Sequence, residues 1–376
     1  MYFETKNLSV GYSGKTLIRD INISVERGKI LTLIGPNGSG KSTILKTITN
    51  HLEKIAGVVR LDNDNLAKLS NKELAKKLSV MLTERIDPEL MTCGQVVGMG
   101  RYPYTNYFGM LTPKDREVVL ESLAMVHALE LKDRPFTDIS DGQRQRIMLA
   151  RAICQQPEII VLDEPTSYLD IRHKVELLDI LRRMATEKQV AVVMSLHEID
   201  LAAKISDQII CVKGDNIEIF GTPEEVFTDE LVASLYGMES GSFNTLFGSV
   251  ELSAPQGEPK VFVVGGAGKG IPIYRLLQKH KQPFAAGILF DNDIDYQVAK
   301  ALASRVVKAE AFRPVTGELI EEARALIRQA EWIIDAKTPV GEFNRCNEDL
   351  LGYARSLGKQ VVSHVDPGLM DGADTM

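Results

Sequence analysis

The sequence predicts an α/β protein of two domains, each built around a parallel sheet. Its length of 376 residues exceeds that of a typical single domain. Short and mainly apolar strands, such as 30–34 and 159–162, alternate with segments of helical periodicity, as in sheets covered on both faces. A second alternation of this kind begins at Val261, after a stretch rich in glycine, proline and small polar residues.

The composition is that of an ordinary globular protein, with 44% hydrophobic and 25% charged residues. A net charge of −7 and the absence of a basic region argue against a nucleic-acid partner and against a polybasic membrane patch. No apolar run approaches the roughly 18 residues that span a bilayer. The four cysteines, Cys93, Cys154, Cys211 and Cys346, are scattered, which favours reduced thiols over a zinc site or a disulfide framework.

We expect a first domain at residues 1–239, a linker at 240–260 and a second domain at 261–376. The linker contains two short apolar pieces that could form one small hairpin. From Val261 onward, five strands with four helices between them predict a small doubly wound parallel sheet of Rossmann-like form.

A glycine-rich loop follows the strand at 30–34 and opens a helix. Its glycines let successive amide groups point at one anion, and the positive end of the helix dipole adds to this attraction. We expect Lys41 to reach the β- and γ-phosphates of ATP and the Ser42 hydroxyl to bind Mg²⁺. The loop matches the P-loop pattern and comprises Gly35, Pro36, Asn37, Gly38, Ser39, Gly40, Lys41, Ser42 and Thr43.

A pair of carboxylates ends the second buried strand, in the segment 159–165. Asp163 is placed to hold Mg²⁺ through its water shell, as acidic residues at this position do in P-loop nucleotidases. Glu164 beside it is placed to orient or deprotonate the attacking water. An acidic pair at a strand end can also cap a helix, but in company with the P-loop it predicts ATP hydrolysis.

The segment Ile139-Ser140-Asp141-Gly142-Gln143 precedes another helix. At this point the sequence resembles the ATP-binding-cassette (ABC) ATPases, whose signature is Leu-Ser-Gly-Gly-Gln. Here Asp141 replaces the first glycine and Ile139 the leucine, whereas Ser140, Gly142 and Gln143 are kept. The resemblance covers about residues 1 to 238 and implies a P-loop ATPase fold with a helical subdomain.

Several roles follow only from this resemblance. Tyr12 corresponds to the aromatic residue that stacks on adenine, and His197 to the switch histidine that contacts the γ-phosphate. Ser140, Gly142 and Gln143 would contact nucleotide, and Ser167 to Asp170 would touch a partner subunit. The implied assembly is a head-to-tail homodimer, in which each ATP lies between the P-loop of one subunit and the signature of the other. Catalysis is then expected from Lys41, Glu164 and His197.

One residue of the family pattern is missing. The family places a glutamine, which meets Mg²⁺, near the end of the strand at Val80, where this sequence has Thr83 and Glu84. Either side chain carries an oxygen that could meet the metal, so both remain candidates.

Two segments are similar to the subfamily that energises uptake of iron–siderophore, haem and cobalamin complexes. They are the tyrosine-rich segment 100–109 and the segment 169–174. This resemblance implies a peripheral subunit at the cytoplasmic face of the membrane, working with integral-membrane permease subunits and an extracytoplasmic substrate-binding protein. A soluble ABC-type ATPase, whose C-terminal domain is the effector or ligand-sensing module, remains the alternative.

In the C-terminal domain, the turn Gly265–Gly270 after a strand, with Asp291 at the end of the next strand, imitates a dinucleotide site. The fit is imperfect, because Ile271 stands where the third glycine of the fingerprint would be. A phosphate-bearing ligand and a purely structural or partner-binding role are both left open.

Overall fold

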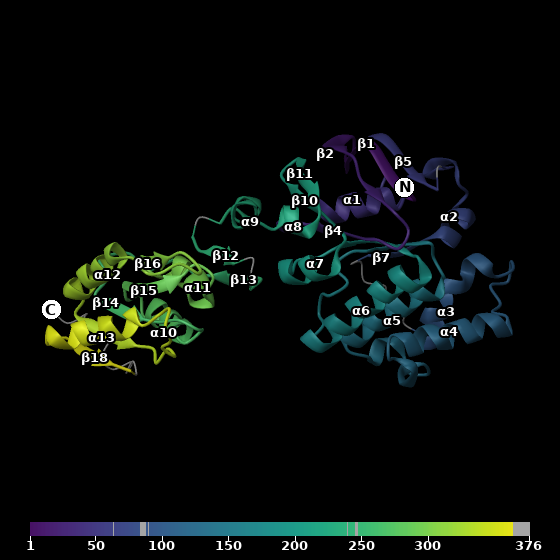
Figure 1. The fold of residues 1–376 in the computed structure, drawn as a ribbon. Coiled ribbons are helices and arrows are strands. Elements are labelled where there is room, and N and C mark those ends of the chain that lie inside the picture. Colours follow the sequence, from purple (N-terminus) through teal and green to yellow (C-terminus); the bar gives the residue numbers. More distant parts are fainter. Residues whose placement is uncertain (63, 83–87, 89, 239, 245–246, 364–376) are drawn as a thin grey trace. The chain divides into compact units, whose positions relative to one another are not determined.

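The computed structural model describes residues 1–62, 64–82, 88, 90–238, 240–244 and 247–363. Within it the chain forms two compact units, Met1–Tyr236 and Gly237–Met376 (Figure 1). Thr83 and Glu84, the two candidates for the missing glutamine, lie outside the described residues.

The first unit is built on a six-stranded sheet with the order β11-β10-β4-β9-β8-β7, in which only β10 and β11 pair antiparallel. Every residue of β4, β8 and β9 is buried, which explains why these strands are apolar except for the hydroxyl residues Thr32 and Ser195. The strands are β4 (Ile30–Ile34), β7 (Leu78–Met81), β8 (Ile159–Leu162), β9 (Ala191–Ser195), β10 (Gln208–Lys213) and β11 (Asn216–Gly221).

A second, antiparallel sheet of this unit has the order β2-β1-β5-β6, with β3 paired to β1. Helix α1 (Lys41–Ile48) contributes Ile44, Leu45 and Ile48 to the core shared by the two sheets. This core therefore fixes the start of α1, where the glycine-rich loop ends. The strands are β1 (Phe3–Tyr12), β2 (Lys15–Ile21), β3 (Ser24–Val25), β5 (Ala56–Leu61) and β6 (Asp64–Asn65).

Helices α3, α4 and α5 pack on one another and form the helical subdomain that the family resemblance implied. Each of them begins with a reciprocal capping box, at Thr92, Thr112 and Ser140. The helices of the unit after α1 are α2 (Asn71–Lys77), α3 (Cys93–Gly98), α4 (Pro113–Met125), α5 (Asp141–Cys154), α6 (Ile171–Lys188), α7 (Ile199–Ile205), α8 (Pro223–Val226) and α9 (Asp229–Tyr236), with short 3₁₀ turns η1 (Leu66–Lys68), η2 (Met99–Tyr104), η3 (Leu129–Leu131) and η4 (Phe136–Asp138).

The second unit carries a five-stranded parallel sheet with the order β16-β15-β14-β17-β18. Helices α10 and α11 pack on one face and α12 and α13 on the other, so the prediction of a doubly wound sheet is confirmed. The elements are β14 (Val261–Val264), α10 (Ile271–Lys279), β15 (Phe284–Phe290), α11 (Ile294–Leu302), β16 (Arg305–Ala309), α12 (Gly317–Gln329), β17 (Trp332–Asp335), α13 (Cys346–Ser356) and β18 (Gln360–Val362).

The segment expected as a linker contains a hairpin of β12 (Ser242–Asn244) and β13 (Ser249–Glu251). The side-chain amide of Asn244 donates to the carbonyl of Gln297 at 3.0 Å, and Arg275 pairs with the buried Glu251 at 2.5 Å. These contacts attach the hairpin to the second unit, so this part of the segment is structured.

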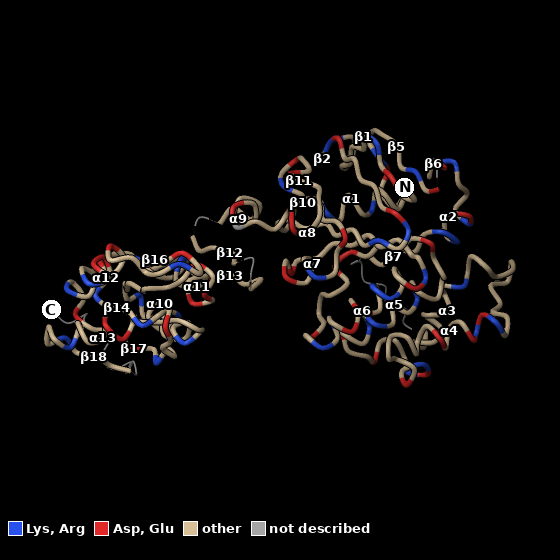
Figure 2. The backbone as a smooth tube through the Cα atoms, in the orientation of Figure 1, with Lys and Arg blue, Asp and Glu red and all other residues tan. Residues whose placement is uncertain are grey.

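Lysine and arginine alternate with aspartate and glutamate along both units, without a long stretch of one sign (Figure 2). Across the described residues, none of the helices has the length and apolarity that a membrane crossing requires.

Candidate functional site

The candidate site of the first unit lies where three neighbouring parallel strands end. Strands β4, β9 and β8 are adjacent in the sheet, in that order. Their carboxyl ends meet at one edge and carry the glycine-rich loop after β4, His197 after β9 and the carboxylates Asp163 and Glu164 after β8. Gly35 and His197, which lie 162 positions apart in the sequence, are thereby brought to the same edge of the sheet.

The glycine-rich loop depends on glycine at two positions above all. Gly35 and Gly40 have φ of +149° and +97°, which side chains disfavour. A Cβ atom on Gly35 would lie 2.2 Å from the carbonyl oxygen of Val212, and one on Gly40 would lie 2.6 Å from Ile18 Cδ1. The close backbone oxygen excludes a larger residue at position 35, and the positive φ disfavours one at position 40.

Lys41 begins helix α1 and is only 5% exposed. Its ammonium group donates to the carbonyl of Gly35 at 2.7 Å and to that of Pro36 at 3.0 Å. Burial lowers the pKa of Lys41, and the carboxylates of Glu164 and Asp163 oppose that shift. Lys41 therefore interacts electrostatically with Glu164, the predicted general base, and with Asp163, the predicted Mg²⁺ ligand.

Asp163 and Glu164 are held by a residue that sequence reasoning missed. Ser195, the fully buried last residue of β9, donates its hydroxyl to Asp163 Oδ1 at 2.7 Å. The same hydroxyl accepts the backbone N–H of Glu164 at 2.9 Å. A lone hydroxyl at the end of an otherwise apolar strand, two positions before His197, was the available signal.

The Glu164 side chain makes two contacts with predicted residues. His197 Nε2 lies 2.6 Å from Glu164 Oε1, and Ser167 donates to Glu164 Oε2 at 3.2 Å. Glu164 itself has φ of +50°, an uncommon backbone state for a residue with a side chain. Gln145 of α5, also missed, donates to the carbonyl of Pro165 at 3.0 Å and so supports this turn from the helical subdomain.

Tyr12 is 51% exposed, and its hydroxyl lies 3.1 Å from the Thr43 hydroxyl in a hydrogen bond. Thr43 is the last residue of the glycine-rich loop motif. The bond therefore places an exposed aromatic ring beside that loop, where the sequence predicted a contact with adenine.

The signature residues form a separate structure. Ser140 caps helix α5: its hydroxyl accepts the backbone N–H of Gln143 at 3.3 Å, and its own N–H donates to Gln143 Oε1 at 3.0 Å. Within the described part of the chain, no hydrogen bond joins Ser140, Gly142 or Gln143 to the loop 35–43. The structure thus brings Lys41, Asp163, Glu164, His197 and Tyr12 together and leaves the signature outside this group.

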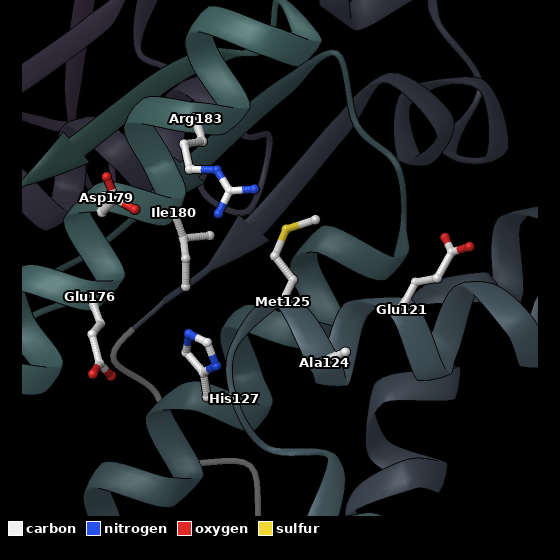
Figure 3. A pocket seen from close by; sticks show the side chains of 8 residues that line it. All are labelled: Glu121, Ala124, Met125, His127, Glu176, Asp179, Ile180 and Arg183. Atoms are coloured by element: carbon white, nitrogen blue, oxygen red, sulfur yellow. The ribbon is translucent and has the colours of Figure 1, made fainter.

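A pocket of about 440 Å³ opens between α4 and α6 (Figure 3). Met125 and Ile180 give it an apolar wall, while Glu121, Glu176 and Asp179 line its edge. None of its lining residues belongs to the predicted nucleotide site, so this pocket is a separate feature of the first unit.

In the second unit, the turn Gly265–Gly270 is occupied by side chains of the chain itself. The buried Asp295 carboxylate accepts the backbone N–H groups of Gly266 at 2.5 Å and Gly270 at 2.9 Å. Asp293 accepts the N–H of Ala267 at 2.9 Å. Two aspartates therefore take the positions at which a phosphate would accept these hydrogen bonds.

Asp291, the acidic residue of the dinucleotide-like pattern, accepts the N–H of Ala311 at 2.9 Å. The hydroxyl of Tyr274 would lie 2.2 Å from a Cβ atom on Gly265 and 2.4 Å from one on Gly270. These two glycines make room for a buried tyrosine, so the structure favours close packing over the dinucleotide site that the sequence imitated.

Comparisons with known proteins agree with this geometry. The ABC transporter family matches residues 18–167, and a second family, the MJ0874 family, matches residues 284–375. An uncharacterized ABC transporter ATP-binding protein of Methanocaldococcus jannaschii is 43% identical over 287 residues, which cover 76% of this chain and 99% of that protein. The relative is matched over almost its whole length, and about a quarter of the present chain lies outside the match.

Two relatives carry functional names. The iron(3+)-hydroxamate import ATP-binding protein of Bacillus subtilis is 36% identical over 236 residues, covering 63% of this chain and 88% of that protein. The cobalamin import ATP-binding protein of Halobacterium salinarum is 29% identical over 307 residues, covering 80% of this chain and 77% of that protein.

Solved structures share the fold of the first unit. A dimeric ATP-binding cassette in a post-hydrolysis state, bound to ADP and Pi, is 26% identical, with a TM-score of 0.53 over 59% of this chain and 98% of that one. The cbiO1 protein of Clostridium perfringens, part of the ABC transporter complex cbiONQ, is 27% identical, with a TM-score of 0.53 over 62% of this chain and 93% of that one.

The predicted P-loop ATPase fold and the family resemblance are therefore confirmed, and an additional C-terminal domain is present. The chain belongs to the ABC transporter ATP-binding proteins and is the ATP-binding, ATP-hydrolysing subunit of an ABC transporter.

Proposed function

We propose that this subunit energises the uptake of a metal chelate, of the iron–siderophore, haem or cobalamin class, through a separate membrane permease. The observation that carries this proposal is an exposed aromatic segment on a buried base, at residues 102–110 of the first unit. The names of its import relatives support the cargo class. The subunit would work at the cytoplasmic face of the membrane, with an extracytoplasmic protein delivering the cargo.

Tyr107 and Phe108 stand at the tip of this segment, 99% and 81% exposed, and their rings form an edge-to-face pair with centroids 5.8 Å apart. Met110, 66% exposed, follows them. Large aromatic side chains that stand free of the core are typical anchors of protein interfaces, because they bury much area at a small cost in conformational entropy. A permease segment would cover them in the assembled transporter.

The base of the segment is buried and ionic. Arg101 pairs with Asp115 of α4 at 2.9 Å, and both residues are 5% exposed. Arg101 also donates to the carbonyl of Cys154, the last residue of α5. The ring of Tyr104 lies over the Arg101 guanidinium, 4.0 Å from it. A force on the aromatic tip would therefore reach α4 and α5 directly, which suits a coupling surface.

For hydrolysis, we assign the general base to Glu164, which orients or deprotonates the attacking water. His197, 2.6 Å from Glu164 Oε1, would hold that carboxylate and contact the γ-phosphate. Lys41 would leave the carbonyls of Gly35 and Pro36 to meet the β- and γ-phosphates.

Hydroxyl and carboxylate oxygens are the donors that Mg²⁺ prefers, and the Ser42 hydroxyl and buried Asp163 at this edge of the sheet fit that ion. When bound there, Mg²⁺ would neutralise charge on the phosphates. Thr83 and Glu84 remain candidates for a further contact.

The assembly we propose is the head-to-tail homodimer, with Ser140, Gly142 and Gln143 of one subunit facing the ATP of the other. Exposed apolar side chains surround the predicted partner contact: Tyr168 is 74%, Ile171 81% and Val175 56% exposed. Such a group is unfavourable in water, so a partner surface that covers it would be stabilised by the burial.

Affinity purification of the tagged chain, from detergent-solubilised membranes of the cells that naturally produce it, tests the proposal. We expect a multi-span membrane protein to copurify with the wild type. It should be lost from Tyr107→Ser/Phe108→Ser, while the ATPase rate of that variant is kept. Phe312→Ser, which changes an 88% exposed aromatic of the second unit, is the matched control and should retain the partner. Recovery of soluble proteins alone would favour an ATPase whose C-terminal domain is the effector.

A further inference from the structure

Glu198 follows His197 directly and occupies the N-cap position of helix α7. A carboxylate at this position normally accepts an N–H of the first helical turn. The side chain of Glu198 makes no such bond. Its hydrogen bonds therefore serve a different part of the structure.

Both carboxylate oxygens of Glu198 are bound to segments that follow Glu164. Thr166, which is 2% exposed, donates its hydroxyl to Glu198 Oε2 at 3.0 Å. Lys174 of α6 donates to Glu198 Oε1 at 2.5 Å. The side chains of this ion pair are 24% and 28% exposed. The pair is thus partly shielded from solvent. Burial acts to raise the pKa of the Glu198 carboxyl, but the hydrogen bonds from Lys174 and Thr166 hold this pKa below its usual value.

Two consecutive residues thus join the same pair of segments. His197 contacts Glu164, and Glu198 contacts Thr166, two residues further along the turn. Among the hydrogen bonds of the described residues, loss of the Glu198 contacts would leave the His197–Glu164 contact to join the segment after β9 to this turn. A shift of about 1 Å is enough to impair catalysis substantially.

We propose that Glu198 and Lys174 are positioning residues for hydrolysis: their ion pair fixes His197 against Glu164. This inference rests on the proposed roles of those two residues. Lys174 lies on the same helix as the exposed Ile171 and Val175, so the pair also links the proposed dimer contact to the catalytic carboxylate.

The test compares ATPase kinetics of full-length variants. Glu198→Gln keeps an acceptor for Thr166 but removes the charge, and Lys174→Met removes the partner. In each, we expect kcat to fall about tenfold while KM for ATP stays within about twofold, because ground-state binding of nucleotide is untouched. The exchanged variant Lys174→Glu/Glu198→Lys restores the ion pair but leaves Thr166 without its acceptor, so its kcat should be at least about threefold above that of either single variant without reaching the wild type.

Glu176→Gln is the matched control, because it breaks the Arg172–Glu176 ion pair of 2.8 Å on the same helix without touching the segment after β9. We expect it to keep the wild-type kcat. Melting temperatures of Glu198→Gln and Glu176→Gln should be similar, whereas a merely structural role would lower only the former.

The variant Glu164→Gln distinguishes the positioning role of Glu198 and Lys174 from the general-base role of Glu164. We expect it to bind ATP and to lose turnover by about a hundredfold or more. Wild-type kcat in Glu198→Gln, or no recovery in the exchanged variant, would overturn the positioning role while a slow Glu164→Gln upholds the general base. Near-normal turnover in Glu164→Gln would instead overturn the catalytic assignment on which the positioning role rests.

Discussion

The two units contain glycine-rich loops that begin alike and end differently. Each loop follows a buried parallel strand, β4 or β14, and opens a helix. Gly35 and Gly266 have φ of +149° and +142°, and Gly38 and Gly268 both have φ of +79°. The first loop runs directly into Lys41, whose ammonium group lies within it. The second ends at Gly270, and the carboxylate of Asp295 lies within it.

The difference between the loops shows what glycine spacing can and cannot predict. In both, a curled backbone directs N–H groups toward one point, and an anion at that point is stabilised. Asp295 supplies this anion in the second unit from a helix some 25 residues further along the chain. In the second loop the Asp295 carboxylate already accepts the N–H groups that a phosphate would bind. In the first loop the buried ammonium group of Lys41 attracts a phosphate.

The largest effect expected from this comparison is on nucleotide binding. Lys41→Ala removes the cation of the first loop and should weaken ATP binding by about a hundredfold. Lys269→Ala removes an exposed lysine of the second loop and should leave binding unchanged. Titration of both full-length variants with a fluorescent ATP analogue measures this. Equal losses in the two would mean that both loops hold nucleotide.

A smaller effect is expected on the stability of the second unit. Asp295→Ala leaves the buried N–H groups of Gly266 and Gly270 without their acceptor, at a cost of about 2–4 kcal/mol. Calorimetry should show a lowered transition for the second unit and an unchanged one for the first. A wild-type transition of the second unit that rises with added inorganic phosphate or ATP would contradict a loop filled by its own carboxylate.

The smallest effect is a pH dependence. Burial raises the pKa of the Asp295 carboxyl, although the N–H groups of Gly270 and Gly266 lower it in part. A raised pKa in the folded state means that this group stabilises the fold below its ordinary pKa and that the contribution is lost as the pH rises through the raised value. Asp295→Asn removes this titration but keeps an oxygen acceptor. The melting temperature of this variant should therefore rise relative to that of the wild type as the pH increases above the ordinary pKa of a carboxyl group. A difference that stays constant with pH would contradict this assignment.

Much of the first unit could be predicted from sequence because its chemistry is carried by local patterns. Gly35–Thr43, Asp163–Glu164 and His197 each stand directly after an apolar strand, and parallel strands bring such positions to one edge of the sheet. Ser195, Gln145 and the Lys174–Glu198 pair were missed because each acts through a contact with a distant segment. A single serine, glutamine or ion pair has no local signature.

The sequence by itself determined the two α/β units, the glycine-rich loop with Lys41, and the order of the motifs that marks an ABC ATPase. These features follow from the spacing of apolar residues and glycines along a few turns of chain, which local geometry converts directly into strand, loop and helix. Only the tertiary structure decided that Glu164 meets His197, that Glu198 is tied to Thr166 and Lys174, and that Asp295 fills the second loop. Each of those contacts joins segments whose proximity depends on the packing of the whole sheet, and a carboxylate within a loop is indistinguishable in sequence from one that faces water.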